Sequence, residues 1–174
     1  MTDYQERIRK LHRDLGIPQE FADTCKIPLQ AEADETRSIG LDMFGREQFL
    51  APGVCERWFA MRDAAGEDGI TLMVVSAWRS VDYQCQLIRS KLDQGRTIDE
   101  ILTVNAAPGF SEHHTGRALD LNTTDCEPLS EAFENTEAFR WLQKYAERFG
   151  FEMSYPKNNP FDIVYEPWHW ACRA

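Results

Sequence analysis

The segment SEHHTGRALDL, residues 111–121, constrains the fold of this chain more than any other stretch of its sequence. Gly116 permits a tight turn, and the letters after it alternate as a β-strand does, with Asp120 on one face and two leucines on the other. A carboxylate in such a buried strand is costly unless it is paired or bound to a metal. We therefore expect a strand that carries Asp120 to a polar site, close to the two histidines of the turn.

The spacing of apolar residues predicts helices over residues 4–15, 51–66, 80–92 and 136–150, and the capping-box letters TIDE predict a short helix near residues 97–100. In the helix that Ser80 caps, Tyr83, Leu87, Ile88 and Leu92 are expected to face inward. Strands are expected within residues 70–77, 117–121, 151–155 and 161–172, and residues 19–50 are expected to be loop-rich. Strands separated by helices and ending in a hairpin indicate one α+β domain with a largely antiparallel sheet.

Composition narrows the class of protein. A chain of 174 residues is long enough to bury one core, and its net charge of −10 disfavours a nucleic-acid partner. The longest apolar runs, such as ITLMVVSAW, are too short to cross a bilayer. The first residues lack the apolar part of a secretory signal, and the five cysteines include no CxxC pair. These features favour a cytoplasmic protein with reduced thiols and no transmembrane segment.

A second cluster, YEPWHW, contains His169 with Glu166 three residues before it. One histidine of the first cluster, together with Asp120 and His169, would give a zinc ion three protein ligands and leave one position open for water, as in catalytic sites. Glu166 would remain free to accept a proton. The residues alone leave open which histidine of the first cluster is the ligand, and each of them taken singly also fits a structural role.

One more candidate lies between the strand at 70–77 and the helix after Ser80. Arg79 occupies this junction, where side chains commonly point into a cleft.

These segments resemble the zinc D-alanyl-D-alanine carboxypeptidases of the VanY type, in peptidase family M15 with its LAS-type fold. The resemblance rests on Ser111-x-His113-x-x-Gly116-x-Ala118-x-Asp120 and on Glu166-x-x-His169. SAWRSVDYQ and FGFEMSYP are also similar to family segments, so that residues 70–170 are covered. Trp78 stands where the family usually has tyrosine, a change that could reshape the substrate cleft.

The resemblance implies a Hedgehog/DD-peptidase-like fold and assigns the roles. Zinc would be bound by His113, Asp120 and His169, and Glu166 would be the general base. Arg79 would hold the oxyanion or the substrate carboxylate, assisted by Gln84 and Ser111. The substrate would be a peptidoglycan stem peptide or muropeptide ending in D-Ala. Residues 46–174 would form the catalytic domain, and residues 1–45 a helix-and-loop extension packed on it.

Several alternatives remain at this level. L,D-carboxypeptidase or D-Ala-D-Ala dipeptidase activity would use the same residues. A zinc-binding module without activity, as in the Hedgehog signalling domain, is a different class, but it would need neither Glu166 nor Arg79. A cell-wall hydrolase also fits the cell envelope, in tension with the missing signal segment. We expect the protein to be a monomer.

Overall fold

The computed structural model describes residues 2–161 and 163–173. Its α-helices are α1 (Asp3–Asp14), α2 (Phe21–Thr24), α3 (Pro52–Glu67), α4 (Val81–Asp93), α5 (Ile98–Leu102) and α6 (Glu137–Tyr145). Its strands are β1 (Arg37–Leu41), β2 (Glu47–Leu50), β3 (Met73–Ser76), β4 (Ala118–Asn122), β5 (Phe151–Met153) and β6 (His169–Cys172). Three 3-10 turns complete it, η1 (Glu112–Thr115), η2 (Glu131–Asn135) and η3 (Ala146–Phe149).

Four of these strands form the central sheet, in the order β3-β4-β6-β5 with every pair antiparallel. This confirms the predicted α+β fold with an antiparallel sheet. The predicted C-terminal strand is shorter than expected, because residues 163–168 run as a loop and turn and the strand begins only at His169. The helix expected over residues 136–150 changes into the 3-10 turn η3 after Tyr145.

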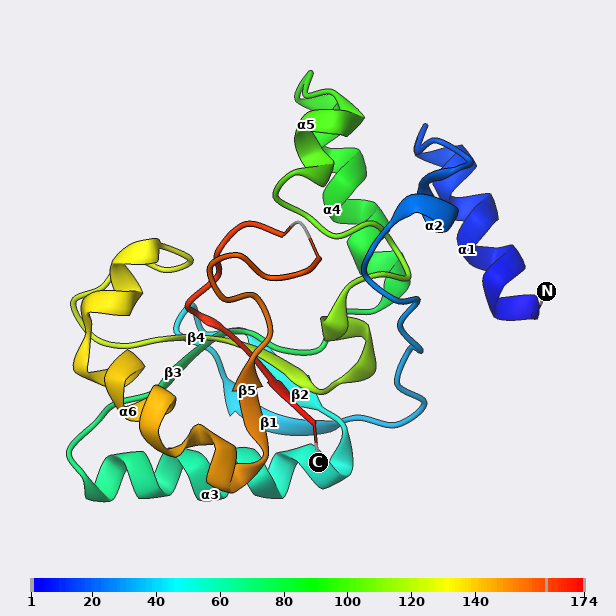
Figure 1. Cartoon of the computed structure of the whole chain (residues 1–174). Helices are drawn as coiled ribbons and strands as arrows, with labels where there is room; N and C mark the ends of the chain where they lie inside the picture. The colour runs from blue at the N-terminus through cyan, green and yellow to red at the C-terminus, as the bar shows by residue number, and fades with distance from the viewer. Residues whose placement is uncertain (1, 162, 174) are drawn as a thin grey trace.

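The two faces of the central sheet differ, since one packs on the apolar core and the other carries polar side chains. Leu119, Leu121 and Trp170 belong to a core cluster that also contains the buried side chains of α3 and α6. Because side chains alternate along a strand, Asp120 and His169 face the opposite way. Figure 1 shows α3 running beneath the sheet, so that the other face is left for a site.

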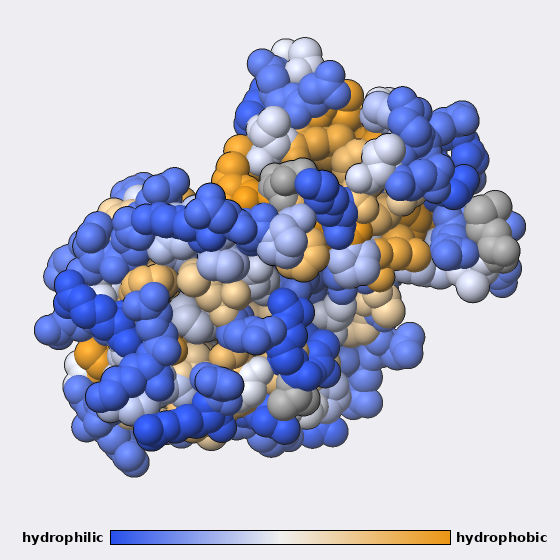
Figure 2. All heavy atoms as spheres, viewed as in Figure 1, coloured by the Kyte–Doolittle hydropathy of each residue, from blue (hydrophilic) through white to orange (hydrophobic). Residues whose placement is uncertain are grey.

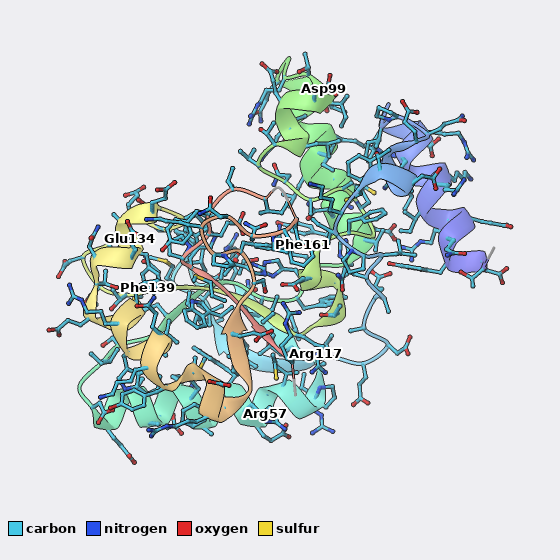
Figure 3. All side chains as sticks on the ribbon, in the orientation of Figure 1. Arg57, Asp99, Arg117, Glu134, Phe139 and Phe161 are labelled. Carbon is cyan, nitrogen blue, oxygen red and sulfur yellow. The ribbon has the colours of Figure 1, made fainter. Side chains whose placement is uncertain are left out.

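A second cluster joins the N-terminal segment to the middle of the chain. Ile8 on α1 packs with Val81 and Ile88 on α4 and with Ile101 on α5. Figure 2 shows apolar atoms gathered between α4–α5 and this N-terminal segment. Figure 3 places Phe161 between these helices and the sheet.

One expectation about this part of the chain was wrong, and one was incomplete. Ile88 is buried as predicted, but Tyr83 is 42% exposed, since the rest of the buried face of α4 consists of Val81, Gln84 and Cys85. The region expected to be loop-rich contains the β1–β2 hairpin, whose turn is held by the buried carboxylate of Asp42. Asp42 accepts hydrogen bonds from the backbone of Phe44 and Arg46 and from the Arg46 side chain. Most side chains of β1 are exposed, so this strand lacks the alternation of apolar and polar residues by which a strand is predicted from sequence.

The helices of the described chain offer no candidate for a membrane span, since none is both long and apolar enough.

Candidate active site

Two neighbouring strands and one turn bring the metal-binding candidates together. Asp120 on β4 and His169 on β6 are direct partners in the antiparallel register. The turn η1 ends at Gly116 in the left-handed conformation and places His113 next to them. One ligand atom from each of these three buried residues lies within 4.8 Å of the other two. This geometry is compact enough to hold one ion.

His113 presents a bare lone pair to this site. Its Nδ1 lies 2.6 Å from the carbonyl oxygen of Ala77, which can only accept, so Nδ1 carries the proton and Nε2 does not. Nε2 lies 3.2 Å from the Asp120 carboxylate, which is also an acceptor. Within the described chain this buried nitrogen has no hydrogen-bond partner. An orphaned imidazole nitrogen beside a carboxylate is the arrangement that a metal ion completes.

His114, in contrast, is occupied by backbone groups. Its Nδ1 lies 2.7 Å from the carbonyl oxygen of Arg79, and its Nε2 accepts the N–H of Gly109 at 3.1 Å. Both ring nitrogens are therefore used to connect three loops. This observation separates the two adjacent histidines, which sequence spacing alone could not do.

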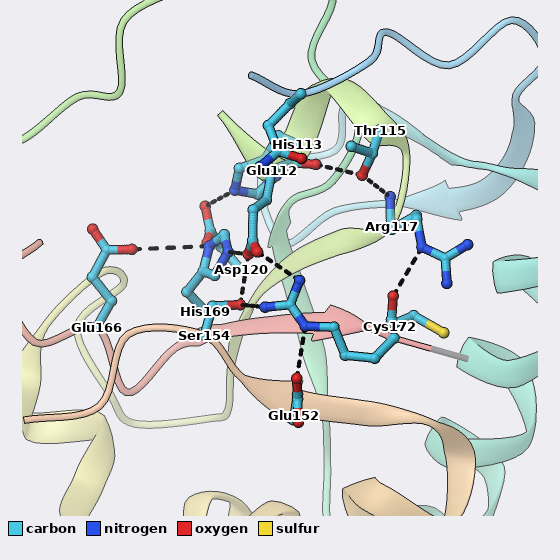
Figure 4. A network of polar contacts seen from close by, with 12 residues as sticks. Glu112, His113, Thr115, Arg117, Asp120, Glu152, Ser154, Glu166, His169 and Cys172 are labelled. Atoms are coloured by element: carbon cyan, nitrogen blue, oxygen red, sulfur yellow. Dashed lines mark hydrogen bonds and ion pairs between the residues drawn. The ribbon is translucent and has the colours of Figure 1, made fainter. Parts of the chain in front are cut away.

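His169 lies between carboxylates. Its Nδ1 is 3.0 Å from Asp120 and 3.9 Å from Glu166, and its Nε2 is 2.9 Å from Glu112 (Figure 4). The ring of Tyr155 packs against it at 4.8 Å between centroids. The imidazole is thus held on several sides.

The electrostatics of the site suit a cation. Burial and the nearby Arg79 charge lower the pKa of His113 to about 4, so that this ring is neutral at pH 7. Burial alone would raise the pKa of Asp120, but its contact with the charged His169 ring holds it below its usual value. Burial would lower the pKa of His169, but its contacts with Asp120 and Glu112 raise it. The donor set of two imidazoles and a carboxylate fits a divalent metal such as zinc.

Arg79 reaches the site from the β3–α4 junction. Its Nη2 lies 4.0 Å from Asp120, and its Nη1 donates to Gln84 Oε1 at 3.3 Å. Its Nε is buried and, among the described residues, has no partner, which leaves a donor for a ligand. Gln84 is only 1% exposed, and its Nε2 donates to the carbonyl oxygen of Ala106. Gln84 thus fixes the position of the Arg79 guanidinium through a hydrogen bond.

Glu166 and Ser111 complete the cleft, a cavity of about 360 Å³ that is also lined by Arg79 and the three metal-binding candidates. This volume is in the range of small-molecule sites. Burial raises the pKa of Glu166 to about 7, despite the nearby His169 charge. A carboxylate with a pKa near neutrality can both accept and return a proton.

Comparison with known proteins identifies the family. The model of the family described as VanY, D-alanyl-D-alanine carboxypeptidase, matches residues 47–173. The chain belongs to the VanY family. Its catalytic candidates therefore all lie within the segment that VanY proteins share.

Three relatives show how close this similarity is. A putative carboxypeptidase of Bacillus subtilis, YodJ, is 40% identical over 130 residues, which are 71% of this chain and 46% of the relative. The solved structure of the LdcB LD-carboxypeptidase superposes with a TM-score of 0.71 at 30% identity, covering 83% of this chain and 71% of that one. A mutant of the VanY D,D-pentapeptidase, solved in complex with Zn(II), has a TM-score of 0.63 at 26% identity, covering 85% and 83%. The chain spans less than half the length of the B. subtilis protein.

Sequence reasoning missed Glu112 and the two residues that bind it, Ser154 and Arg173. Glu112 is charged but only 8% exposed, and it contacts His169, Ser154 and Arg173. Its position beside His113 in SEHH was the one available signal. Ser154 and Arg173 gave none, because they reach the site only through the β5–β6 pairing.

The VanY-type turn at Gly116 predicts a sharp stability effect. Gly116 has φ +65°, and an added Cβ would lie 2.8 Å from the backbone nitrogen of Ala51. We expect Gly116→Ala to lower the free energy of unfolding by roughly 1–2 kcal/mol, because alanine is strained in the left-handed conformation, and by a further amount because of this clash. Gly69→Ala is the control, since Gly69 has φ +76° with open space around it. Thermal unfolding of both variants measures the difference, and equal losses would contradict a close approach at Gly116.

Proposed function

We propose that the chain is a zinc-dependent carboxypeptidase that removes the terminal D-Ala from peptidoglycan stem peptides. The observation that carries this proposal is the convergence of one ligand atom each from His113, Asp120 and His169 within 4.8 Å, in one cavity with Glu166 and Arg79. A purely structural metal site would need neither of the last two residues. Family membership and the Zn(II) complex of the related VanY structure support the same assignment.

Each side chain has a task in this proposal. His113, Asp120 and His169 would hold the zinc, which when bound supplies Lewis acidity and lowers the pKa of water. Glu166 accepts the proton of the attacking water on its carboxylate and returns it to the leaving amine. The Arg79 guanidinium binds the anionic end of the peptide or the charge that develops on the scissile carbonyl. Ser111 lines the same cavity and is proposed to contact the substrate, with Gln84 keeping Arg79 in place.

The preferred bond is tested by product analysis. The similarity to the LdcB LD-carboxypeptidase favours L,D-carboxypeptidase action as the second candidate. Penta-, tetra- and dipeptide substrates should be incubated with and without zinc and the products identified by mass spectrometry. We expect zinc-dependent release of D-Ala from the pentapeptide. Release only from the tetrapeptide would assign the L,D activity, cleavage of only the dipeptide the dipeptidase, and no product from any of them would contradict an enzymatic role.

We further propose that residues 46–174 are the catalytic part and that residues 1–45 support it. His12 Nε2 lies 2.8 Å from the carbonyl oxygen of Pro108, in the loop that leads to the metal-site turn. The backbone N–H of Ala33 donates to the carbonyl oxygen of His114 at 2.8 Å. The β1–β2 hairpin crosses residue 46, so the two parts share one small sheet.

Replacing Arg79 tests its role directly. Arg79→Lys keeps the charge but not the planar set of donors, and a lysine cannot reproduce contacts with two acceptors. We expect kcat/KM to fall by about 10²–10³-fold with the fold intact, as when one donor of an oxyanion site is removed. Arg89→Lys on the exposed side of the adjacent helix α4 is the control and should have no effect. Near-wild-type turnover by Arg79→Lys would rule out direct contact with the substrate.

A further inference from the structure

The imidazole of His169 has two possible proton positions, and only one leaves the metal site open. A neutral histidine carries one N–H. Here Nε2 faces Glu112 at 2.9 Å and Nδ1 faces Asp120 at 3.0 Å, so the charged ring can donate to both carboxylates, and a ring that binds a metal keeps only one of these two protons. If the proton lies on Nδ1, it points at Asp120 and occupies the direction of the metal. If it lies on Nε2, the Nδ1 lone pair is available.

The neighbours of Glu112 make its carboxylate a hydrogen-bond acceptor. Its Oε2 accepts the hydroxyl of Ser154 at 2.5 Å, and its Oε1 accepts from Arg173 Nη1 at 2.7 Å. The hydroxyl direction of Ser154 is fixed as well, because its oxygen accepts from Arg173 Nη2 at 2.9 Å. With Ser154 and Arg173 donating to its two oxygens, the Glu112 carboxylate is oriented to accept the N–H of His169 Nε2.

Three segments of the chain create this arrangement. Glu112 begins the turn η1, Ser154 follows β5, and Arg173 follows β6, the strand that begins at His169. Figure 4 shows Glu112 and Glu166 on different sides of the His169 ring. Both carboxylates line the cleft, but Glu112 contacts Nε2, the ring nitrogen away from Asp120, whereas Glu166 lies on the side of Nδ1.

We infer that Glu112, held by Ser154 and Arg173, is a positioning residue that keeps the His169 proton on Nε2 and so directs Nδ1 to the metal. The inference rests on the proposed zinc site but not on the identity of the peptide substrate. Carboxylates behind metal-binding histidines typically contribute about 10–100-fold to metal affinity.

The variant Glu112→Gln has a defined consequence. Arg173 donates to one oxygen of Glu112, so it should hold the amide oxygen of E112Q and leave the NH₂ group facing His169. That NH₂ group is a donor, which would drive the histidine proton to Nδ1. We expect the zinc dissociation constant, measured by competition with a chelator, to rise by roughly 10- to 100-fold.

The matched control is Glu152→Gln. Glu152 is an exposed carboxylate that contacts the same arginine, with its Oε1 2.7 Å from Arg173 Nε. We expect it to leave the zinc affinity unchanged. Ser154→Ala is a milder second variant that removes one donor to Glu112 and should weaken zinc binding several-fold, even if Glu112→Gln does not fold.

The proton position itself is measured by nitrogen NMR of the imidazole rings, which is simple here because the chain has four histidines. In the zinc-loaded wild type we expect His169 to carry its proton on Nε2. A proton on Nδ1, or an unchanged zinc affinity in folded Glu112→Gln, would overturn the inference. Neither result depends on turnover: a failure to hydrolyse any stem peptide would reject the proposed function and leave this inference standing, whereas absence of zinc binding would reject both.

Discussion

Glu166→Gln should retain zinc and lose at least about 10²–10⁴-fold in turnover of a D-Ala-terminated peptide, the usual contribution of general acid–base assistance. The carboxylate of Glu166 lies 3.9 Å from His169 Nδ1, and its side chain is 19% exposed, on the wall of the cleft. The amide keeps the size of the side chain but cannot take a proton. Folding and metal content should therefore survive while proton transfer fails.

Zinc content and peptide hydrolysis have to be measured on the same preparation. If Glu166 were a fourth zinc ligand, Glu166→Gln would lower the metal content, and the site would be closed and structural. Retained zinc with unchanged hydrolysis would instead remove Glu166 from the mechanism. Glu137→Gln, an exposed position in the first turn of α6, controls for the general effect of losing one negative charge.

The strand carrying Asp120 and the position of Arg79 could be predicted because their signals are local. Alternation along β4 puts Asp120 on the face away from the core leucines, and Arg79 lies in the short junction between the apolar strand β3 and α4. The register that places Asp120 opposite His169 joins residues far apart in the chain. Zinc-ligand chemistry suggested that the two clusters meet, and the resemblance to a known family selected His113, but the register itself came only from the structure.

The errors and omissions have a common physical cause, since each depends on a tertiary partner. Tyr83 fits a helical spacing, but the polar Gln84 is the buried residue because Arg79 and Ala106 provide its hydrogen bonds. Asp42 gave no sign of a hairpin, because its turn is held by one buried carboxylate rather than by an alternating strand. Glu112 received no role from the sequence, because its partner Arg173 is far away along the chain.

The adjacent histidines should give opposite results when each is replaced by alanine. The wild type should bind about one zinc per chain, as expected for a three-ligand catalytic site. His113→Ala removes the nitrogen that faces Asp120 at 3.2 Å, so the loss of zinc affinity should exceed the roughly 10–100-fold contributed by groups behind the ligands. Only one backbone acceptor, the carbonyl oxygen of Ala77, loses its partner.

His114→Ala should instead keep zinc and lose stability. Its ring bonds the carbonyl oxygen of Arg79 and the N–H of Gly109, and each buried backbone group left unpaired costs about 1–3 kcal/mol. Metal analysis and thermal unfolding should be carried out on both variants. We expect His113→Ala to lose zinc and His114→Ala to have the larger decrease in unfolding temperature. Full zinc retention by His113→Ala together with zinc loss in His114→Ala would reverse the ligand assignment. It would mean that the turn ending at Gly116 presents the ring of His114, and not that of His113, to Asp120.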